Sequence, residues 1–380
     1  MSRWLLPVKL GLVRAEIAGE VISPPYDLYT PLQRFDHASG HPRNFLNATL
    51  SEEDHTDLDL ENRRARASQY LDRELAAGTW NFAGERMAIL RLQSRGHVQT
   101  GVVGDVPAAA FPGLVRPHEH TRPDRVEDLT HYLRDVGYGS SPVGLAYRRR
   151  PGIDAIVSRL TGRAPDLDVT LDDGDRQEVW LVEDAQDLDS LAAAFADLDA
   201  AYIIDGHHRV AATVGRDDRS GNPGGRFLSV AFPDEDLVVY PFHRWVDADL
   251  KKPPSPPDGS PTGLDPSRGE AVVVTRAGEW KIDLQPGPDE EDASALARAV
   301  LGPQLGVADE RTDPRMSFVP GFPDADTLRG RVSEYGGVGF LLHPSTVESV
   351  MAVSDRGGTM PPKATFFAPK PRSGLFLVKR

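Results

Sequence analysis

Residues 202–213, with the sequence YIIDGHHRVAAT, constrain the fold of this chain more than any other stretch. Three apolar residues precede an Asp-Gly pair, two histidines and an arginine follow, and the sequence then becomes small and apolar again. This pattern predicts a buried strand that turns at Gly206 into a helix. The corner between the two elements is dense in titratable side chains, which requires a chemical explanation.

The sequence before this corner predicts alternating strands and helices. Residues 178–182 (EVWLV) and 201–205 (AYIID) have the composition of strands, and residues 187–198 place apolar side chains at helical spacing between them. Nearer the N-terminus, residues 59–78 predict a helix that ends at a glycine, and residues 86–106 predict two strands joined by the turn Ser-Arg-Gly.

Another helix is predicted over residues 126–136, where four apolar residues form one stripe. We expect it to begin just after Glu119, with Thr121 and Asp124 as a capping box. In the last third, residues 292–302 and 345–358 predict two further helices.

The stretch 251–270 is rich in proline and glycine and predicts a linker or an exposed loop. Four parts are therefore expected. They are an N-terminal mixed α/β region over residues 1–105, a core over 106–250, the linker over 251–270, and a C-terminal α/β region over 271–380 that contains the segment MPPKATFF.

Composition excludes several classes of function. The chain of 380 residues has 43 basic and 57 acidic side chains, a formal charge of −14 that opposes non-specific binding to nucleic acid or anionic lipid. It contains no run of about 18 apolar residues, so no membrane segment is expected. Cysteine is absent, and a cytoplasmic location is the default expectation.

The corner at Gly206 has the properties of an anion site. The first N–H groups of a helix have no acceptor within the helix, and the helix dipole adds partial positive charge. His207, His208 and Arg209 add side-chain donors, and arginine binds phosphate in a bidentate manner. Asp205 would repel a phosphate unless a metal ion, or a proton taken from a substrate hydroxyl, compensates its charge.

Two other interpretations of the corner remain open. Asp205 would cap the helix in one of them, and the two histidines would then lie on its exposed first turn. The other is a zinc site built from the histidines at 118, 120, 207 and 208, although neighbouring histidines point about 100° apart on a helix and no HExxH pair is present.

Two further segments have chemical potential. In PHEHT, Glu119 lies between two histidines just before a predicted helix, which suits a carboxylate that takes a proton from an alcohol, or equally a solvated loop. In MPPKATFFAPK, prolines stiffen the backbone beside Lys363, Thr365 and Lys370. The alternative there is a core role for the two phenylalanines and solvated lysines.

With these motifs identified, the chain resembles a large bacterial family of unknown function. Members of that family have PPYD near the start, HExT and DGHHR in the middle, then PxHR, and MPxKSTxF near the end. This chain has SPPYD, HEHT, DGHHR, YPFHR and MPPKATFF in that order, so the resemblance covers nearly all of its length. The DGHHR corner also resembles that of the ParB/sulfiredoxin-like fold, in the two-histidine form of the free serine kinases.

This resemblance implies a ParB/sulfiredoxin-like core and a role for each matching residue. It makes Glu119 the general base, Asp205 a group that orients the hydroxyl or a metal, and the corner residues a phosphate cradle, and it places the remaining residues on the substrate side. The cradle is Gly206, His207, His208 and Arg209, and the substrate side is His118, Phe242, Lys363, Thr365, Tyr26 and Asp27. The chain departs from the kinases after Thr365, where two phenylalanines replace Arg and His.

The function implied is a nucleotide-dependent phosphotransferase, a kinase that acts on the hydroxyl of a small molecule, with ATP or ADP and Mg²⁺. The sequence leaves the acceptor, the donor (ATP, ADP or CTP) and the oligomeric state undefined. Two alternatives are a non-catalytic nucleotide-binding switch of the ParB type and a metal-dependent hydrolase. The net charge and the lack of a basic helix-turn-helix argue against nucleic acid as a partner.

Overall fold

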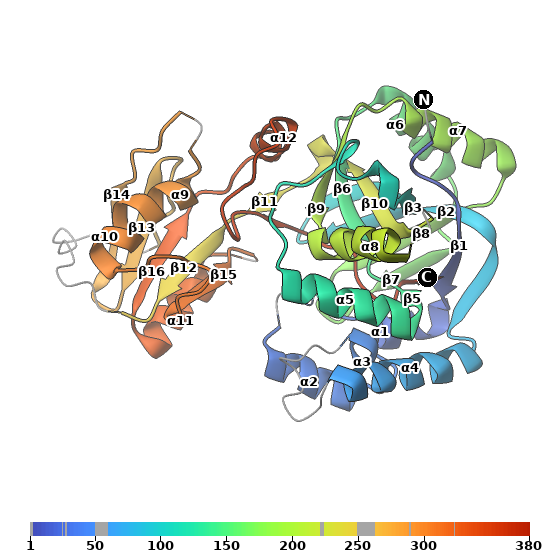
Figure 1. Cartoon of the computed structure of the whole chain (residues 1–380), viewed down its shortest axis with the longest axis horizontal. Coiled ribbons are helices and arrows are strands. Elements are labelled where there is room, and N and C mark those ends of the chain that lie inside the picture. The colour runs from blue at the N-terminus through green and yellow to red at the C-terminus, as the bar shows by residue number, and fades with distance from the viewer. Residues whose placement is uncertain are drawn as a thin grey trace. The chain divides into compact units, whose positions relative to one another are not determined.

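The computed structural model of the chain describes residues 3–24, 26, 29–49, 60–220, 224–248, 263–288, 290–322 and 324–380 (Figure 1). It is a mixed α/β protein, as the sequence predicts. By compactness it divides into two units. Unit 1 is Met1–Pro117, Thr121–Leu237 and Pro369–Arg380, and unit 2 is His118–His120 and Val238–Ala368. Most of the predicted linker, residues 251–262, lies outside the described residues.

A mixed sheet forms the centre of unit 1 and contains eleven of the strands that the structure describes. They are β1 (Val8–Val13), β2 (Trp80–Ser94), β3 (His97–Pro107), β4 (Val115–Arg116), β5 (Tyr138–Gly139), β6 (Val143–Tyr147), β7 (Leu167–Thr170), β8 (Arg176–Val182), β9 (Ala201–Asp205), β10 (Arg226–Pro233) and β18 (Phe376–Lys379). The order is β4-β9-β6-β10-β3-β2-β1-β18-β5, and β8 pairs with β2 and β7. Strands from the N-terminal third, the middle and the C-terminus thus share one sheet.

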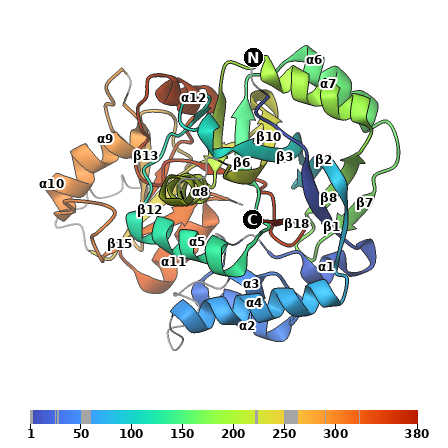
Figure 2. The same cartoon turned by 45° about the vertical axis from the view of Figure 1, so that its right-hand side comes forward.

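Helices surround this sheet. They are α1 (Ala18–Val21), α2 (Pro31–Gly40), α3 (Leu46–Thr49), α4 (Leu60–Ala76), α5 (Pro123–Val136), α6 (Pro151–Leu160), α7 (Ala185–Ala196) and α8 (His207–Ser220), with short 3₁₀ turns η1 (Ala15–Ile17), η4 (Ala108–Ala110) and η5 (Asp234–Asp236). Figures 1 and 2 show α5 alongside α8, where the Thr130 hydroxyl donates to the Ala212 carbonyl at 3.5 Å. Leu191 and Phe195 of α7 and Val210 of α8 belong to one core cluster with the sheet.

The local predictions for unit 1 are confirmed except at the start of α5. The hairpin of β2 and β3 turns through Arg95 and Gly96, both at positive φ, as a two-residue turn requires. The predicted capping box of α5 is wrong, because the helix begins at Pro123 and its N-cap residue, Arg122, makes no side-chain cap bond. Proline suits the first helical position, since its fixed φ is helical and its missing N–H is not needed there.

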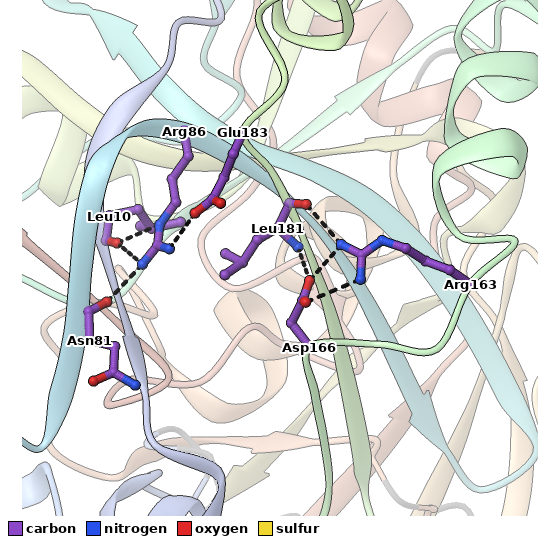
Figure 3. Close-up of polar contacts among 7 residues, drawn as sticks. All are labelled: Leu10, Asn81, Arg86, Arg163, Asp166, Leu181 and Glu183. Atoms are coloured by element: carbon purple, nitrogen blue, oxygen red, sulfur yellow. Dashed lines mark hydrogen bonds and ion pairs between the residues drawn. The ribbon is translucent and has the colours of Figure 1, made fainter.

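A buried arginine supports a bulge between the first two strands (Figure 3). The register of β1 against β2 shifts between Lys9 and Gly11, and the Leu10 carbonyl accepts from Arg86 Nε at 2.9 Å and Nη2 at 2.6 Å. The guanidinium also pairs with Glu183 of the neighbouring segment at 2.9 Å. Arg86 thus satisfies a carbonyl at the point where the regular pairing of the strands is interrupted.

Unit 2 contains a five-stranded antiparallel sheet of order β14-β13-β16-β12-β15 and a two-stranded pair, β11-β17. Its strands are β11 (Val239–Tyr240), β12 (Phe242–Val246), β13 (Glu270–Thr275), β14 (Gly278–Asp283), β15 (Met316–Pro320), β16 (Val338–Leu342) and β17 (Phe366–Phe367). Its helices are α9 (Asp292–Leu296), the π-helical turn η6 (Ala297–Leu301), α10 (Gly302–Leu305), α11 (Asp326–Tyr335) and α12 (Val347–Asp355).

Both faces of this sheet are covered, which explains why its central strands are apolar throughout. Val273 of β13 packs in a cluster with Leu296 and Leu301, whereas its neighbour Val272 packs on the opposite side with Leu328. The helix predicted over residues 292–302 is present but is interrupted by the π-helical turn. Within the described parts of the chain, no helix combines the length and apolar character needed to span a membrane.

Candidate functional site

The predicted corner of unit 1 is formed where β9 ends and α8 begins. Gly206 joins them with φ +96°, a conformation that side chains other than glycine rarely adopt. A Cβ at this position would lie 2.8 Å from Nε and Nη2 of Arg209. Glycine is therefore required for the turn itself, and it also leaves room for the guanidinium of Arg209.

Two cations neutralise Asp205 at this corner. Lys370 Nζ lies 2.9 Å from Oδ1, and Arg209 Nη2 lies 2.5 Å from Oδ2. Burial alone would raise the pKa of Asp205, but the charges of Lys370 and Arg209 outweigh it and hold that pKa well below the ordinary value. The conflict between Asp205 and an anion is therefore resolved by two cations of the chain itself.

Lys370 is the corner residue that sequence reasoning did not place there. It lies 165 residues from Asp205 and comes from the C-terminal segment of unit 1, where the preceding residue, Pro369, accepts a bond from Gln99 Nε2 at 3.0 Å through its carbonyl. The only local signal was its position after a proline, which indicated a rigid backbone at Lys370 but did not identify Asp205 as its ion-pair partner.

Arg209 is held by three acceptors. Besides Asp205, its Nη1 donates to the carbonyls of Ser141 and Pro142 at 2.7 and 2.9 Å, just before β6. A guanidinium has five N–H donors. Among its contacts with the described residues, two of these five donors are not engaged, so the side chain is fixed in place and can still bind an anion.

The two histidines of the corner differ in environment. His207 is buried, at 7% exposure, whereas His208 is partly exposed. The Nε2 atom of His208 accepts from the backbone N–H of Arg122 at 3.0 Å, next to the first residue of α5. This bond requires the tautomer that carries its proton on Nδ1. His208 therefore joins the start of α5 to the start of α8.

In unit 2 the structure brings together two of the predicted motifs, PHEHT and MPPKATFF. The His118 carbonyl accepts from the Met360 N–H at 2.7 Å, and His118 Nε2 lies 3.2 Å from the Thr365 hydroxyl. His120 Nε2 lies 3.4 Å from the hydroxyl of Thr359. Both neighbours of Glu119 are thus anchored, while Glu119 itself is partly exposed.

Arg244 fixes the backbone beside Lys363. This arginine of β12 is fully buried, pairs with Glu310 at 2.8 Å, and donates to the carbonyls of Pro362 and Lys363 at 3.0 and 2.9 Å. Lys363 has φ +48°, in the left-handed region, and its exposed ammonium lies 5.1 Å from the ring centre of Phe242. Arg244 was not predicted, although it belongs to the motif YPFHR.

The remaining predicted residues have separate environments. Phe366 and Phe367 are buried, at 2% and 3% exposure, so the core interpretation of these rings is confirmed. Tyr26 is partly buried, with the Arg34 guanidinium 3.9 Å from its ring centre, and Asp27 lies outside the described residues. In the described part of the chain, no three His, Asp or Glu side chains are grouped so that they could hold a metal ion.

The family described as "Protein of unknown function (DUF1015)" matches residues 5–255 of the chain. No match was found among curated proteins. Among solved structures, the chain is similar to a mutant free serine kinase in complex with ADP, with 15% identity and a TM-score of 0.41, covering 73% of this chain and 91% of that one.

Two other similar structures have comparable scores. A free serine kinase in complex with AMP has 16% identity and a TM-score of 0.40, covering 73% of this chain and 90% of the kinase. A conserved hypothetical protein from Pyrococcus furiosus has 15% identity and a TM-score of 0.38, covering 73% and 94%.

Proposed function

The chain belongs to the DUF1015 family of proteins of unknown function, and we propose that it binds a nucleotide and transfers a phosphoryl group to the hydroxyl of a small molecule. The observation that carries this proposal is the corner at Gly206. There the N-terminus of a 14-residue helix, Arg209 and Lys370 surround a single carboxylate, Asp205.

The charge at the corner favours an anion. Arg209 and Lys370 contribute two positive charges and Asp205 one negative charge, so the cluster is positive even with neutral histidines, and the helix dipole adds to it. Phosphoryl transfer depends mainly on positioning and charge neutralisation, which such a corner supplies without a Walker-type glycine loop. The phosphates of ATP or ADP would lie against the N–H groups of the first turn of α8 and the remaining donors of Arg209.

A bound Mg²⁺ would have few protein ligands here. Asp205 is already paired with two cations, and the described residues offer no group of three metal-binding side chains. In phosphoryl-transfer enzymes Mg²⁺ is commonly held largely by the substrate phosphates and water. We therefore assign Mg²⁺, if required, to the nucleotide and derive no step through it.

We assign the acceptor side of the reaction to Glu119, Lys363 and His118. Glu119 would take the proton of the acceptor hydroxyl, which its anchored backbone and partly exposed side chain support. Lys363 would contact the substrate through its exposed ammonium. His118 would act through Thr365, with which it is hydrogen-bonded.

Calorimetric titration with ATP, ADP and CTP, with and without Mg²⁺, tests the proposal. We expect micromolar to millimolar binding of at least one nucleotide, and a loss of about 10- to 100-fold in Lys370→Gln, since a charged hydrogen bond contributes roughly 1.5–3 kcal/mol. Lys379→Gln, an exposed lysine of the same C-terminal segment, is the matched control and should bind normally. A folded protein that binds none of the three nucleotides would contradict the proposal.

A further inference from the structure

Unit 2 contains a pocket of about 50 Å³ that the proposed function does not yet use. It is lined by the ends of β12 and β16 and by the first residues of α9 and α12, and Phe242 and Ala364 form part of its apolar wall. A water molecule needs roughly 10–15 Å³ on this scale, so the pocket has room for a ligand the size of about four water molecules. Phe242 is also one of the residues assigned to the substrate.

The polar wall of the pocket contains two carboxylates with incomplete partners. Asp292 is 7% exposed, and both of its oxygens accept from the same backbone N–H, that of Gly269, at 3.0 Å. Glu291 accepts from the Ser345 hydroxyl at 2.6 Å. Neither carboxylate forms an ion pair with any described residue. A buried carboxylate without a cation is unfavourable, which contrasts with the doubly paired Asp205.

The pKa of Asp292 shows the same imbalance. Burial raises it above the ordinary value, and the neighbouring Glu291 adds to this rise, although the Gly269 N–H and the charges of His343 and Arg268 oppose it. A positive charge placed in the pocket would stabilise the ionised form of Asp292.

The other polar groups of the wall compensate these carboxylates only in part. Arg244 is committed to Glu310 and to backbone carbonyls, and Arg268 is exposed. His343 donates from Nδ1 to the Pro344 carbonyl at 2.9 Å. The charges of Arg268 and His343 oppose the rise in the pKa of Asp292 but do not cancel it.

We propose that this pocket binds the protonated amine of a small hydroxylated amine, with Asp292 and Glu291 as its counter-ions and Phe242 against its carbon chain. The identification of this amine as the phosphoryl acceptor rests on the proposed function. A divalent metal ion is the less suitable occupant, because no three metal-binding side chains are grouped in the described residues. A second carboxylate or phosphate in the pocket would be repelled by Asp292 and Glu291.

The test is a titration of the full chain, without nucleotide, monitored by ligand-observed NMR. Ethanolamine is the cationic probe, and glycerol and glycolate are the neutral and anionic probes of similar size. We expect ethanolamine to bind and the other two not to bind at the same concentration. Asp292→Asn should weaken ethanolamine binding at least tenfold, whereas Glu348→Gln, an exposed carboxylate in the first turn of α12, should leave it within twofold of the wild type.

Folding is monitored by thermal melting. Asp292→Asn should melt no lower than the wild type, because the amide removes a buried charge and keeps an acceptor for the Gly269 N–H. If this variant does not fold, Glu291→Gln, at a partly exposed position, decides the matter in the same titration. Absence of ethanolamine binding, equal binding of glycerol, or unchanged binding in the folded variants would overturn the proposal.

An ADP titration of the same preparation separates this inference from the proposed function. Ethanolamine binding without nucleotide binding would support the pocket and contradict the kinase. Nucleotide binding without ethanolamine binding would contradict the pocket alone.

Discussion

Substitution of Gly206 by alanine should disable the corner of unit 1 and destabilise the fold at the same time. Alanine is disfavoured at a φ of +96°, and its Cβ would lie 2.8 Å from the Arg209 guanidinium. Arg209 would have to move from the Ser141 and Pro142 carbonyls and from Asp205. The helix start and its main cation would therefore be displaced together.

The magnitude follows from these two effects. Backbone strain at such a position is about 1–3 kcal/mol, and weakening the charged hydrogen bonds of Arg209 adds about 1–2 kcal/mol. For a unit of this size, each kcal/mol lowers Tm by about 2–4 °C, so Gly206→Ala should melt roughly 5–15 °C below the wild type. Calorimetry at a temperature where the variant is folded should show ADP affinity reduced at least tenfold.

The control is Gly215→Ala in the same helix. Gly215 has no positive φ, and a Cβ there would meet nothing within 4 Å. Alanine should stabilise the helix by about 0.5–1 kcal/mol and leave ADP affinity unchanged. If Gly206→Ala melts like the wild type and binds ADP equally well, neither the backbone angle nor the nearby Arg209 guanidinium limits position 206 to glycine.

Three further predictions follow from individual side chains. Because Lys370 and Arg209 lower the pKa of Asp205, the ionised form of this residue stabilises the protein at neutral pH. The Tm difference between the wild type and Asp205→Asn should therefore shrink as the pH falls below about 4, where Asp205 of the unfolded chain becomes protonated. Glu119→Gln should lower turnover about 10²- to 10⁴-fold with ADP affinity unchanged, and normal turnover with a lower Tm would indicate a structural role. Arg244→Met should cost about 3–5 kcal/mol in urea unfolding, because it leaves the carboxylate of Glu310, whose side chain is only 9% exposed, without its cation. The double variant with Glu310→Gln should recover part of this loss.

Local pattern was enough to predict the elements that form the corner. The strand predicted over 201–205 has the bounds of β9, and the helix that follows Gly206 is α8. Each signal was contained in adjacent residues: apolar side chains for a buried strand, and glycine for a turn at positive φ. Sequence reasoning therefore identified the turn and its acid, histidines and arginine.

Contacts between distant segments could not be predicted in this way. The pairing of Lys370 with Asp205, and of Arg244 with the carbonyls beside Lys363, depends on how the chain returns to the same place after more than a hundred residues. The local spacing of residues does not indicate which distant segments come into contact. The prediction of the start of α5 was wrong for a different reason. Thr121 and Asp124 had the right spacing for a capping box, but Pro123 provided a better first helical residue.

Asp205 and Asp292 show why the charge balance around a carboxylate is informative about ligands. Burial raises the pKa of both groups, but two cations reverse this effect at Asp205, whereas none forms an ion pair with Asp292 among the described residues. The first cluster keeps a net positive charge and gains energy from an anion. The second keeps a net negative charge and gains energy from a cation. Added salt should therefore weaken ADP binding and ethanolamine binding alike. Substitution of one carboxylate by its amide should affect the two sites differently. Asp292→Asn should weaken ethanolamine binding, whereas Asp205→Asn makes its corner more positive and should not weaken ADP binding through charge.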